Sequence, residues 1–257
     1  MVGERINFAT ILTERGVLCM IAVLITGANR GIGFALAQQY AADGTHVIAC
    51  CRDPARADAL RELEASSNGR VRIVQLDVAD EVSISALAHA LGDQPIDILI
   101  NNAGVVGPEP QSATHIDAEG WLTTMRINAL APILIAQALR NNLLRGSEKK
   151  VVAISSTSGS TERYTNDGDN AYAYKASKAA LNNGMRSLAR DWAGDGLLVG
   201  IVDPGYVRTD MGGAGAAASP KSVSAEESAR GIIGCIAKLA PDTSGIFQRY
   251  WGEVIPW

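Results

Sequence analysis

Residues 26–33 of this 257-residue chain read Thr26-Gly27-Ala28-Asn29-Arg30-Gly31-Ile32-Gly33. This glycine-rich turn follows an apolar run, residues 21–25, that is typical of a buried strand, and it leads directly into the helical pattern of residues 34–42. Glycines let the backbone approach a pyrophosphate closely, and a helix N-terminus offers free N–H groups. The spacing is G-x-x-x-G-x-G rather than the common G-x-G-x-x-G, so it is the position between strand and helix that predicts a dinucleotide site.

Further apolar runs alternate with helical patterns along the rest of the chain. Short runs rich in Val, Ile and Leu between helical segments are typical of a parallel sheet covered on both faces. We therefore predict a single-domain α/β fold, a Rossmann-type doubly wound parallel sheet of about seven strands with helices on both faces. Six strands are predicted, over residues 21–25, 47–51, 71–76, 96–100, 151–155 and 198–202.

Length and composition indicate one globular domain. A chain of 257 residues with 47% apolar and 19% charged residues is ordinary for a single α/β domain. We assign residues 20–257 to this domain and residues 1–19 to an appendage that is a helix, a disordered tail or a start-site artefact. The net charge of −4 lacks the basic excess that binds nucleic acid.

The cysteines and histidines do not form a metal-ligand pattern. Neither a zinc site nor a Ser/His triad is predicted, and we expect no bound metal. The cysteines are interpreted as reduced core residues of a cytoplasmic protein. The residues concerned are Cys19, Cys50, Cys51 and Cys235, with His46, His89 and His115.

Membrane segments are not expected. No run reaches the roughly 18 consecutive apolar residues that a membrane span needs. The first twenty residues carry Glu4, Arg5, Glu14 and Arg15, which argue against a signal peptide.

The end of the second predicted strand indicates which dinucleotide binds. An acidic side chain there would hydrogen-bond the ribose of NAD and repel the extra phosphate of NADP, but here Arg52 follows two cysteines. Arg52 and Arg30 supply guanidinium groups that suit a phosphate dianion, so NADP(H) is favoured over NAD(H). Asp53 is the evidence against this choice, and we prefer to interpret it as the cap of a helix that begins at Pro54.

A tyrosine lies four residues before a lysine in a helical pattern further along the chain. Side chains at i and i+4 share a helix face, so Lys178 can hold its charge near the Tyr174 hydroxyl. A nearby cation favours the phenolate and lowers a tyrosine pKa from its usual value of about 10. Tyr174 is therefore a candidate for proton transfer to or from a substrate oxygen. Tyr172 has Ala176 at the same spacing and gains no such cation.

Together and in this order, the motifs resemble those of the short-chain dehydrogenase/reductase family. The resemblance covers nearly all of residues 20–257. Within the family, residues 203–213 and 250–257 resemble the C-factor and sniffer-like carbonyl reductase branch. The matching positions are the glycine turn, Asp77, Asn101-Asn102-Ala103-Gly104, Asn128, Ser155-Ser156, Tyr174, Lys178 and Pro204-Gly205.

The resemblance implies a catalytic site of four residues. Tyr174 is implied to be the general acid for carbonyl reduction or the base for alcohol oxidation. Lys178 is implied to lower the pKa of Tyr174 and to bind the nicotinamide ribose. Ser156 would hold and polarise the substrate oxygen, and Asn128 would keep a proton-relay water near Lys178.

The spacing from serine to tyrosine departs from the family pattern. Eighteen positions separate Ser156 from Tyr174, more than the family usually has, so we expect an insertion within residues 159–170. Ser155 and Ser158 remain alternatives for the catalytic serine. Alternation along the strand and the following Gly159 favour Ser156.

The resemblance also implies how the cofactor is held. Residues 212–219, rich in Gly and Ala, are expected to form a mobile loop over the substrate, with a surface linker as the alternative. The implied cofactor-binding residues are Gly27, Asn29, Arg30, Gly31, Ile32 and Gly33 in the glycine turn; Arg52, Asp77 and Val78 at the adenine end; Asn101, Ala103 and Gly104 beneath the ribose; Tyr174 and Lys178; and Pro204, Gly205, Val207 and Thr209 around the nicotinamide.

The sequence thus predicts an NADP(H)-dependent oxidoreductase that transfers a hydride between nicotinamide and a small carbonyl or alcohol substrate. Because the family tends to pair through the Tyr/Lys helix, we expect a homodimer or homotetramer. The alternative is a dinucleotide-binding signalling or sensor protein of the C-factor type with little or no turnover. A non-catalytic relative has no need to keep Asn128, Ser156, Tyr174 and Lys178 together, and all four are present.

Overall fold

A computed structural model describes residues 11–12, 18–19, 21–163 and 171–257. Its centre is a sheet of seven strands in the order β5-β4-β3-β6-β7-β8-β9, and every neighbouring pair is parallel. The prediction of a doubly wound parallel sheet is confirmed. The strands are β3 Ala22–Thr26, β4 His46–Cys51, β5 Val71–Gln75, β6 Ile98–Asn101, β7 Lys150–Ile154, β8 Leu198–Asp203 and β9 Ile246–Arg249.

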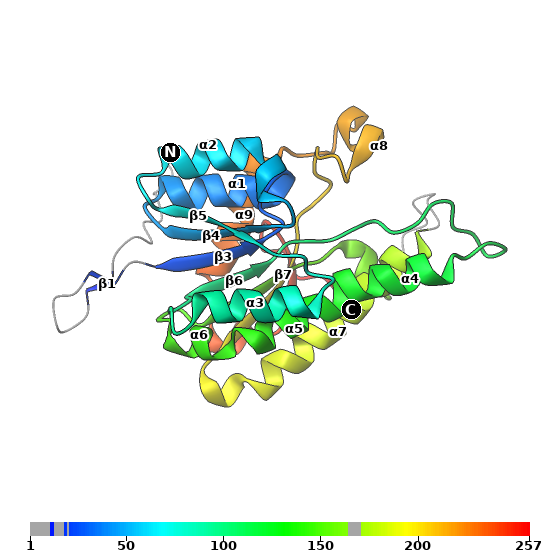
Figure 1. Cartoon of the computed structure of the whole chain (residues 1–257). Helices are drawn as coiled ribbons and strands as arrows, with labels where there is room; N and C mark the ends of the chain where they lie inside the picture. Colours follow the sequence, from blue (N-terminus) through cyan, green and yellow to red (C-terminus); the bar gives the residue numbers. More distant parts are fainter. Residues whose placement is uncertain (1–10, 13–17, 20, 164–170) are drawn as a thin grey trace.

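Helices cover both faces of this sheet (Figure 1). One face carries α1 Gly31–Ala42, α2 Asp58–Ser66 and α9 Ala225–Ala237. The other carries α3 Glu81–Leu91, α5 Ala131–Ala138, α6 Arg140–Arg145 and α7 Tyr172–Asp191, with α4 Ala118–Met125 extending beyond the sheet.

Alternation along the strands builds a separate core on each face. In β3, Val23 and Ile25 pack into the cluster beneath α1 and α9, whereas Leu24 packs into the cluster beneath α3, α5 and α7. All three side chains are fully buried. A strand that is apolar at every position is therefore required, because both of its faces are covered.

The strand order reverses beside β3, which pairs with β4 on one side and with β6 on the other. The chain leaves β3 for α1 on one face and leaves β6 for α4 and α5 on the other. In open α/β sheets, such a reversal leaves a crevice outside the carboxyl ends of the strands. The glycine turn after β3 and residues 102–105 after β6 meet at this crevice.

The segment before the main sheet contains two short strands. β1 Ile11–Leu12 and β2 Leu18–Cys19 pair antiparallel in a sheet of their own. Residues 1–10 and 13–17 lie outside the described part of the chain, so the three alternatives for residues 1–19 stay predictions. The assignment of residues 20–257 to one domain stays a prediction.

None of the helices in the described residues is long and apolar enough to cross a membrane.

Candidate active site

A cleft of about 750 Å³ lies at the carboxyl ends of the strands. It brings together residues from the glycine turn, from the ends of β4, β5, β6 and β7, from α7 and from the segment after β8. The predicted site residues that line it are Gly27, Asn29, Arg30, Gly31, Ile32, Arg52, Asp77, Val78, Ala103, Gly104, Tyr174, Lys178, Pro204 and Thr209. Those that do not line it are Gly33, Asn101, Asn128, Ser156, Gly205 and Val207.

The backbone conformation and close packing of the glycine turn require glycine at three positions. Gly27 and Gly31 have positive φ angles of 64° and 56°, which other residues rarely adopt. A Cβ on Gly33 would lie 2.3 Å from the Gly27 carbonyl oxygen, so Gly33 lets α1 pack against the turn although it does not line the cleft. Arg30 at the N-cap gives the helix no side-chain hydrogen bond, which leaves the N–H groups of the first turn for a ligand.

Asn102 fixes this turn and was not among the predicted site residues. Its Nδ2 donates to the Thr26 carbonyl oxygen at 2.9 Å and to the Gly27 carbonyl oxygen at 3.1 Å, and it lines the cleft. Asn101 is buried instead, and its Nδ2 donates to the Pro132 carbonyl oxygen at 3.4 Å. Adjacent residues of a strand face opposite sides, so the alternation signal could have shown that only one of this pair reaches the cleft.

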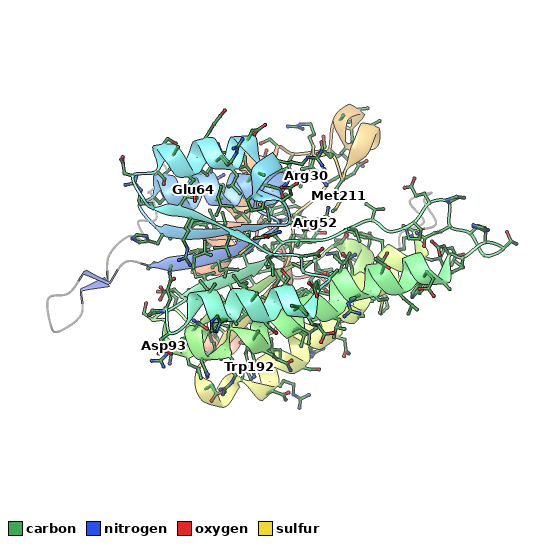
Figure 2. The ribbon with its side chains drawn as sticks, viewed as in Figure 1. Arg30, Arg52, Glu64, Asp93, Trp192 and Met211 are labelled. Carbon is green, nitrogen blue, oxygen red and sulfur yellow. The ribbon has the colours of Figure 1, made fainter. Side chains whose placement is uncertain are left out.

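Three arginines lie along the adenine end of the cleft. Arg30, Arg52 and Arg56 all line it and are exposed, and Figure 2 shows Arg30 and Arg52 at the end of the sheet on the side of α1 and α2. Arg30 Nη1 contacts Asp210 Oδ2 at 2.7 Å. Arg56, which the sequence interpretation missed, ends the short helix Pro54–Arg56 and adds a second guanidinium beside Arg52.

The prediction that Asp53 caps a helix is wrong, because its side chain makes no capping hydrogen bond. Asp53 does precede the helix Pro54–Arg56, but its side chain accepts no capping hydrogen bond there. It lines the cleft instead, beside Arg52 and Arg56. The helix is a single 3-10 turn, which leaves a capping carboxylate few N–H groups to accept from.

The tyrosine and the lysine on α7 both line the cleft. Lys178 Nζ lies 5.7 Å from the centroid of the Tyr174 ring and donates to the Ile154 carbonyl oxygen at 2.9 Å. Lys178 is 5% exposed, and Tyr174 is half-buried. The i+4 spacing thus places the two side chains together, as predicted, with the ammonium anchored to β7.

The prediction that Lys178 lowers the pKa of Tyr174 is wrong for this structure. Burial raises the pKa of Tyr174 to about 12; a hydrogen bond with the Ser156 side chain opposes this rise and the Asp203 charge adds to it. Burial also lowers the pKa of Lys178 to about 8, with Asp203 acting in the opposite direction. Desolvation disfavours the charged form of each group, so it raises the pKa of the phenol and lowers that of the ammonium. Tyr174 therefore carries its proton at neutral pH.

The three candidate serines differ in their partners. The Ser156 side chain acts on the Tyr174 hydroxyl and lowers its pKa, although Ser156 does not line the cleft. Ser155 does line the cleft, but it is only 2% exposed and its hydroxyl donates to Asn182 Oδ1. Ser158 lies two residues after Ser156, and its N–H donates to Ser156 Oγ at 3.1 Å. The contact with Tyr174 favours Ser156 despite the lengthened gap, part of which, residues 164–170, lies outside the described residues.

Asn128 holds the loop after β6. It lies in a π-helical turn, Arg126–Leu130, that separates α4 from α5. Its Nδ2 donates to the Val105 carbonyl oxygen at 2.8 Å and to Ser177 Oγ at 2.9 Å, while its Oδ1 accepts from the Val105 N–H at 2.9 Å. Such turns inside helices are frequent at functional sites. Asn128 is behind the cleft wall, and a water relay through it stays a prediction.

The segment after β8 closes the remaining side. Pro204 and Thr209 line the cleft together with Arg208 and Met211. Gly205 and Val207 lie behind this wall, and Val207 is buried. Residues 213–218 form the short helix α8, Gly213–Ala218, where we expected a loop. All six of its residues are Gly or Ala: the four alanines favour helix, whereas the two glycines disfavour it.

Among the described residues, no group of three or more His, Cys, Asp or Glu side chains is placed to hold a metal ion.

The family model described as short chain dehydrogenase matches residues 21–218, and the chain belongs to this family. It is 39% identical to C-signal of Myxococcus xanthus over 163 residues, which are 63% of this chain and 93% of that protein.

Its structure is similar to that of NADPH-bound carbonyl reductase from chicken fatty liver, with a TM-score of 0.85, 33% identity and coverage of 92% of this chain and 98% of that one. It is also similar to the carbonyl reductase Sniffer of D. melanogaster, with a TM-score of 0.82, 28% identity and coverage of 93% and 100%. The predicted resemblance to the C-factor and sniffer-like branch is confirmed.

Proposed function

We propose that this protein reduces small carbonyl compounds with NADPH and oxidises the corresponding alcohols in reverse. One observation supports the proposal above the others. Ser156, Tyr174 and Lys178 come together at the end of a cleft whose other end is a glycine turn at a helix N-terminus. A proton donor beside a dinucleotide site is the arrangement that carbonyl reduction requires.

The proton comes from Tyr174 in this proposal. When bound, the dinucleotide supplies the hydride. The neutral Tyr174 hydroxyl gives its proton to the substrate oxygen as negative charge develops there, and the Ser156 hydroxyl donates a second hydrogen bond to that oxygen. A pKa of about 12 keeps Tyr174 protonated at neutral pH, so the proton is present for the reduction step. Lys178, close to the ring, would bind the nicotinamide ribose.

The preference for NADP(H) rests on the adenine end of the cleft. Arg52 and Arg56 are exposed there, and neither has an acidic partner within 4 Å in the part of the chain that the structure describes. Guanidinium groups bind a phosphate dianion through paired charge-assisted hydrogen bonds. Asp53 opposes this preference by its charge, but the arginines outnumber it. The chicken carbonyl reductase of similar structure binds NADPH.

The alternative function is dinucleotide binding for signalling without turnover. It is favoured by the 39% identity to C-signal. A site used only for binding would not need both a buried lysine and a serine beside the same tyrosine, so we rank this alternative second.

A combined binding and turnover assay separates the two functions. NADPH binding is followed by the fluorescence of the nicotinamide, and oxidation is followed by its absorbance across a panel of aldehydes and ketones. We expect binding together with carbonyl-dependent oxidation. Binding without oxidation across the whole panel would favour the signalling protein, and the absence of binding would contradict both.

We further propose a homodimer or homotetramer in the cytoplasm. The buried free thiols of Cys50, Cys51 and Cys235 suit a reducing compartment. Light scattering of the purified protein tests the assembly, and a monomer at micromolar concentration would contradict it.

A further inference from the structure

We propose that Asp203 positions the Ser156 turn against the wall of the cleft and holds a negative charge beside Tyr174 and Lys178. It is a positioning residue rather than a catalytic one, and this inference rests on the proposed function. Asp203 is the last residue of β8, is 3% exposed and does not line the cleft. Nothing in the sequence interpretation assigned it a role.

The carboxylate joins two turns. Its Oδ2 accepts from the Thr157 N–H at 2.6 Å, directly after Ser156, and its Oδ1 accepts from the Gly205 N–H at 2.9 Å, directly after the cleft residue Pro204. The first turn carries the serine and the second forms the opposite wall. One side chain therefore sets the distance between the group that polarises the substrate and the wall that confines it.

The charge of Asp203 is only partly neutralised. Arg249 Nη1, from the neighbouring strand β9, lies 3.8 Å from Asp203 Oδ1, which is too long for a hydrogen bond. Arg249 Nε also lies 3.5 Å from Glu253 Oε2, so its charge is shared between two carboxylates. The remaining negative charge acts on Tyr174 and Lys178 of α7, and on Tyr250 beyond β9, which Glu227 also faces.

This charge favours the protonated form of both catalytic side chains. The Asp203 charge adds to the rise in the pKa of Tyr174 that burial causes. For Lys178 it raises the pKa, which opposes the larger lowering caused by burial. A reductase needs the tyrosine proton for transfer and the ammonium for the ribose. Without Asp203, both protons would be lost at lower pH.

A second buried aspartate provides a matched control. Asp97 precedes β6 at the amino end of the sheet and is 2% exposed. Its oxygens accept from the Ala22 N–H at 2.8 Å and from the Ser147 N–H at 2.6 Å. Like Asp203, Asp97 is a buried carboxylate that accepts hydrogen bonds from the backbone of two separate segments, but it lies at the end of the sheet away from the cleft.

The test compares Asp203→Asn with Asp97→Asn. We expect the alkaline limb of the kcat profile for NADPH-dependent reduction to move to lower pH by roughly one unit in Asp203→Asn. The limb should stay in place in Asp97→Asn, although both variants lose thermal stability. Asp203→Glu keeps the charge on a longer stem, so it should retain the wild-type limb with a lower kcat. A limb that stays in place in Asp203→Asn, or moves equally in Asp97→Asn, would overturn the inference.

A second readout does not depend on turnover. The 13Cε resonance of Lys178, assigned by its loss in Lys178→Met, reports the protonation of the ammonium. Its midpoint should fall in Asp203→Asn and not in Asp97→Asn. If the wild-type protein proves inactive while this midpoint falls, the proposed function fails and the electrostatic role of Asp203 stands. An unchanged midpoint would overturn that role.

Discussion

The two ends of the cleft are built in opposite ways. At the adenine end, the charged side chains lie in solvent: Arg30 is 67% exposed, and Arg52 and Arg56 are exposed as well. At the catalytic end, the polar groups are buried and held by the protein itself, with Lys178 5% and Asp203 3% exposed. Lys178 is anchored to β7, and Asp203 is bonded to two turns.

The difference separates binding from chemistry. Exposed arginines stay largely hydrated until an anion binds, so they contribute affinity and selectivity that weaken with salt. Buried groups fixed by the backbone need little reorganisation when charge develops on the substrate. Substitutions at the catalytic end should therefore change kcat, and substitutions at the adenine end should change the affinity for NADPH.

The largest effect is expected at Tyr174. Tyr174→Phe removes the proton donor and keeps the ring, so kcat for reduction should fall by roughly 10³-fold while the Kd for NADPH stays within about threefold. Tyr172→Phe is the matched control, because this neighbouring ring is partly exposed and has no lysine at i+4. An equal loss of NADPH binding and turnover in Tyr174→Phe would contradict the assignment of binding to one end of the cleft and catalysis to the other.

The second-largest effect on kcat is expected at Ser156. Ser156→Ala removes the hydroxyl that contacts Tyr174, and we expect kcat to fall by about 10²-fold, as for the loss of one donor to a developing oxyanion. Ser158→Ala should have little effect on kcat, since only its backbone N–H contacts Ser156. If Ser158→Ala had the larger effect, the assignment of the serine would be wrong.

At the adenine end, Arg52→Ala should raise the Kd for NADPH by roughly tenfold and leave the Kd for NADH nearly unchanged, because only NADPH carries the extra phosphate. Arg61→Ala is the control: Arg61 lies on α2, pairs with Asp58 and does not line the cleft. The ratio of the two Kd values, measured by nicotinamide fluorescence, checks the preference. Equal weakening of both cofactors would contradict the assignment of Arg52 to the phosphate.

The smallest effect is expected at Asp210. This exposed carboxylate pairs with Arg30 across the mouth of the cleft. Exposed ion pairs contribute roughly 0–1 kcal/mol to stability. Asp210→Asn should therefore lower the Kd for NADPH by less than about threefold, because Arg30 becomes available to bind phosphate. The Kd at low and at high salt measures this. A tenfold change would show that the adenine end is more rigidly built than its exposure indicates.

The sequence was most informative where one face or both faces of an element are buried. Strands such as Ala22–Thr26 are continuous apolar runs, and the glycine turn needs its positive φ angles, so both could be predicted from residue type. Strand β9 was not located, because Ile246–Arg249 is short and ends in Gln and Arg at the sheet edge. The i+4 spacing correctly placed Lys178 beside Tyr174.

What the sequence could not provide depends on surroundings built by distant segments. The rise in the pKa of Tyr174 comes from burial and from Asp203, which lies 29 residues away along the chain. Arg56 and Asp53 reach the cleft only because the segment after β4 folds back as a single 3-10 turn.

Hydride transfer to a carbonyl carbon tests the central claim most directly. The protein is incubated with NADPH deuterated at the transferring position of the nicotinamide and with a ketone that the absorbance screen selects. Mass spectrometry should find the alcohol with one deuterium on the former carbonyl carbon, in equal amount to the NADP+ formed, and no such product with Tyr174→Phe. NADPH that binds yet passes no deuterium to any carbonyl compound of the panel would contradict the account.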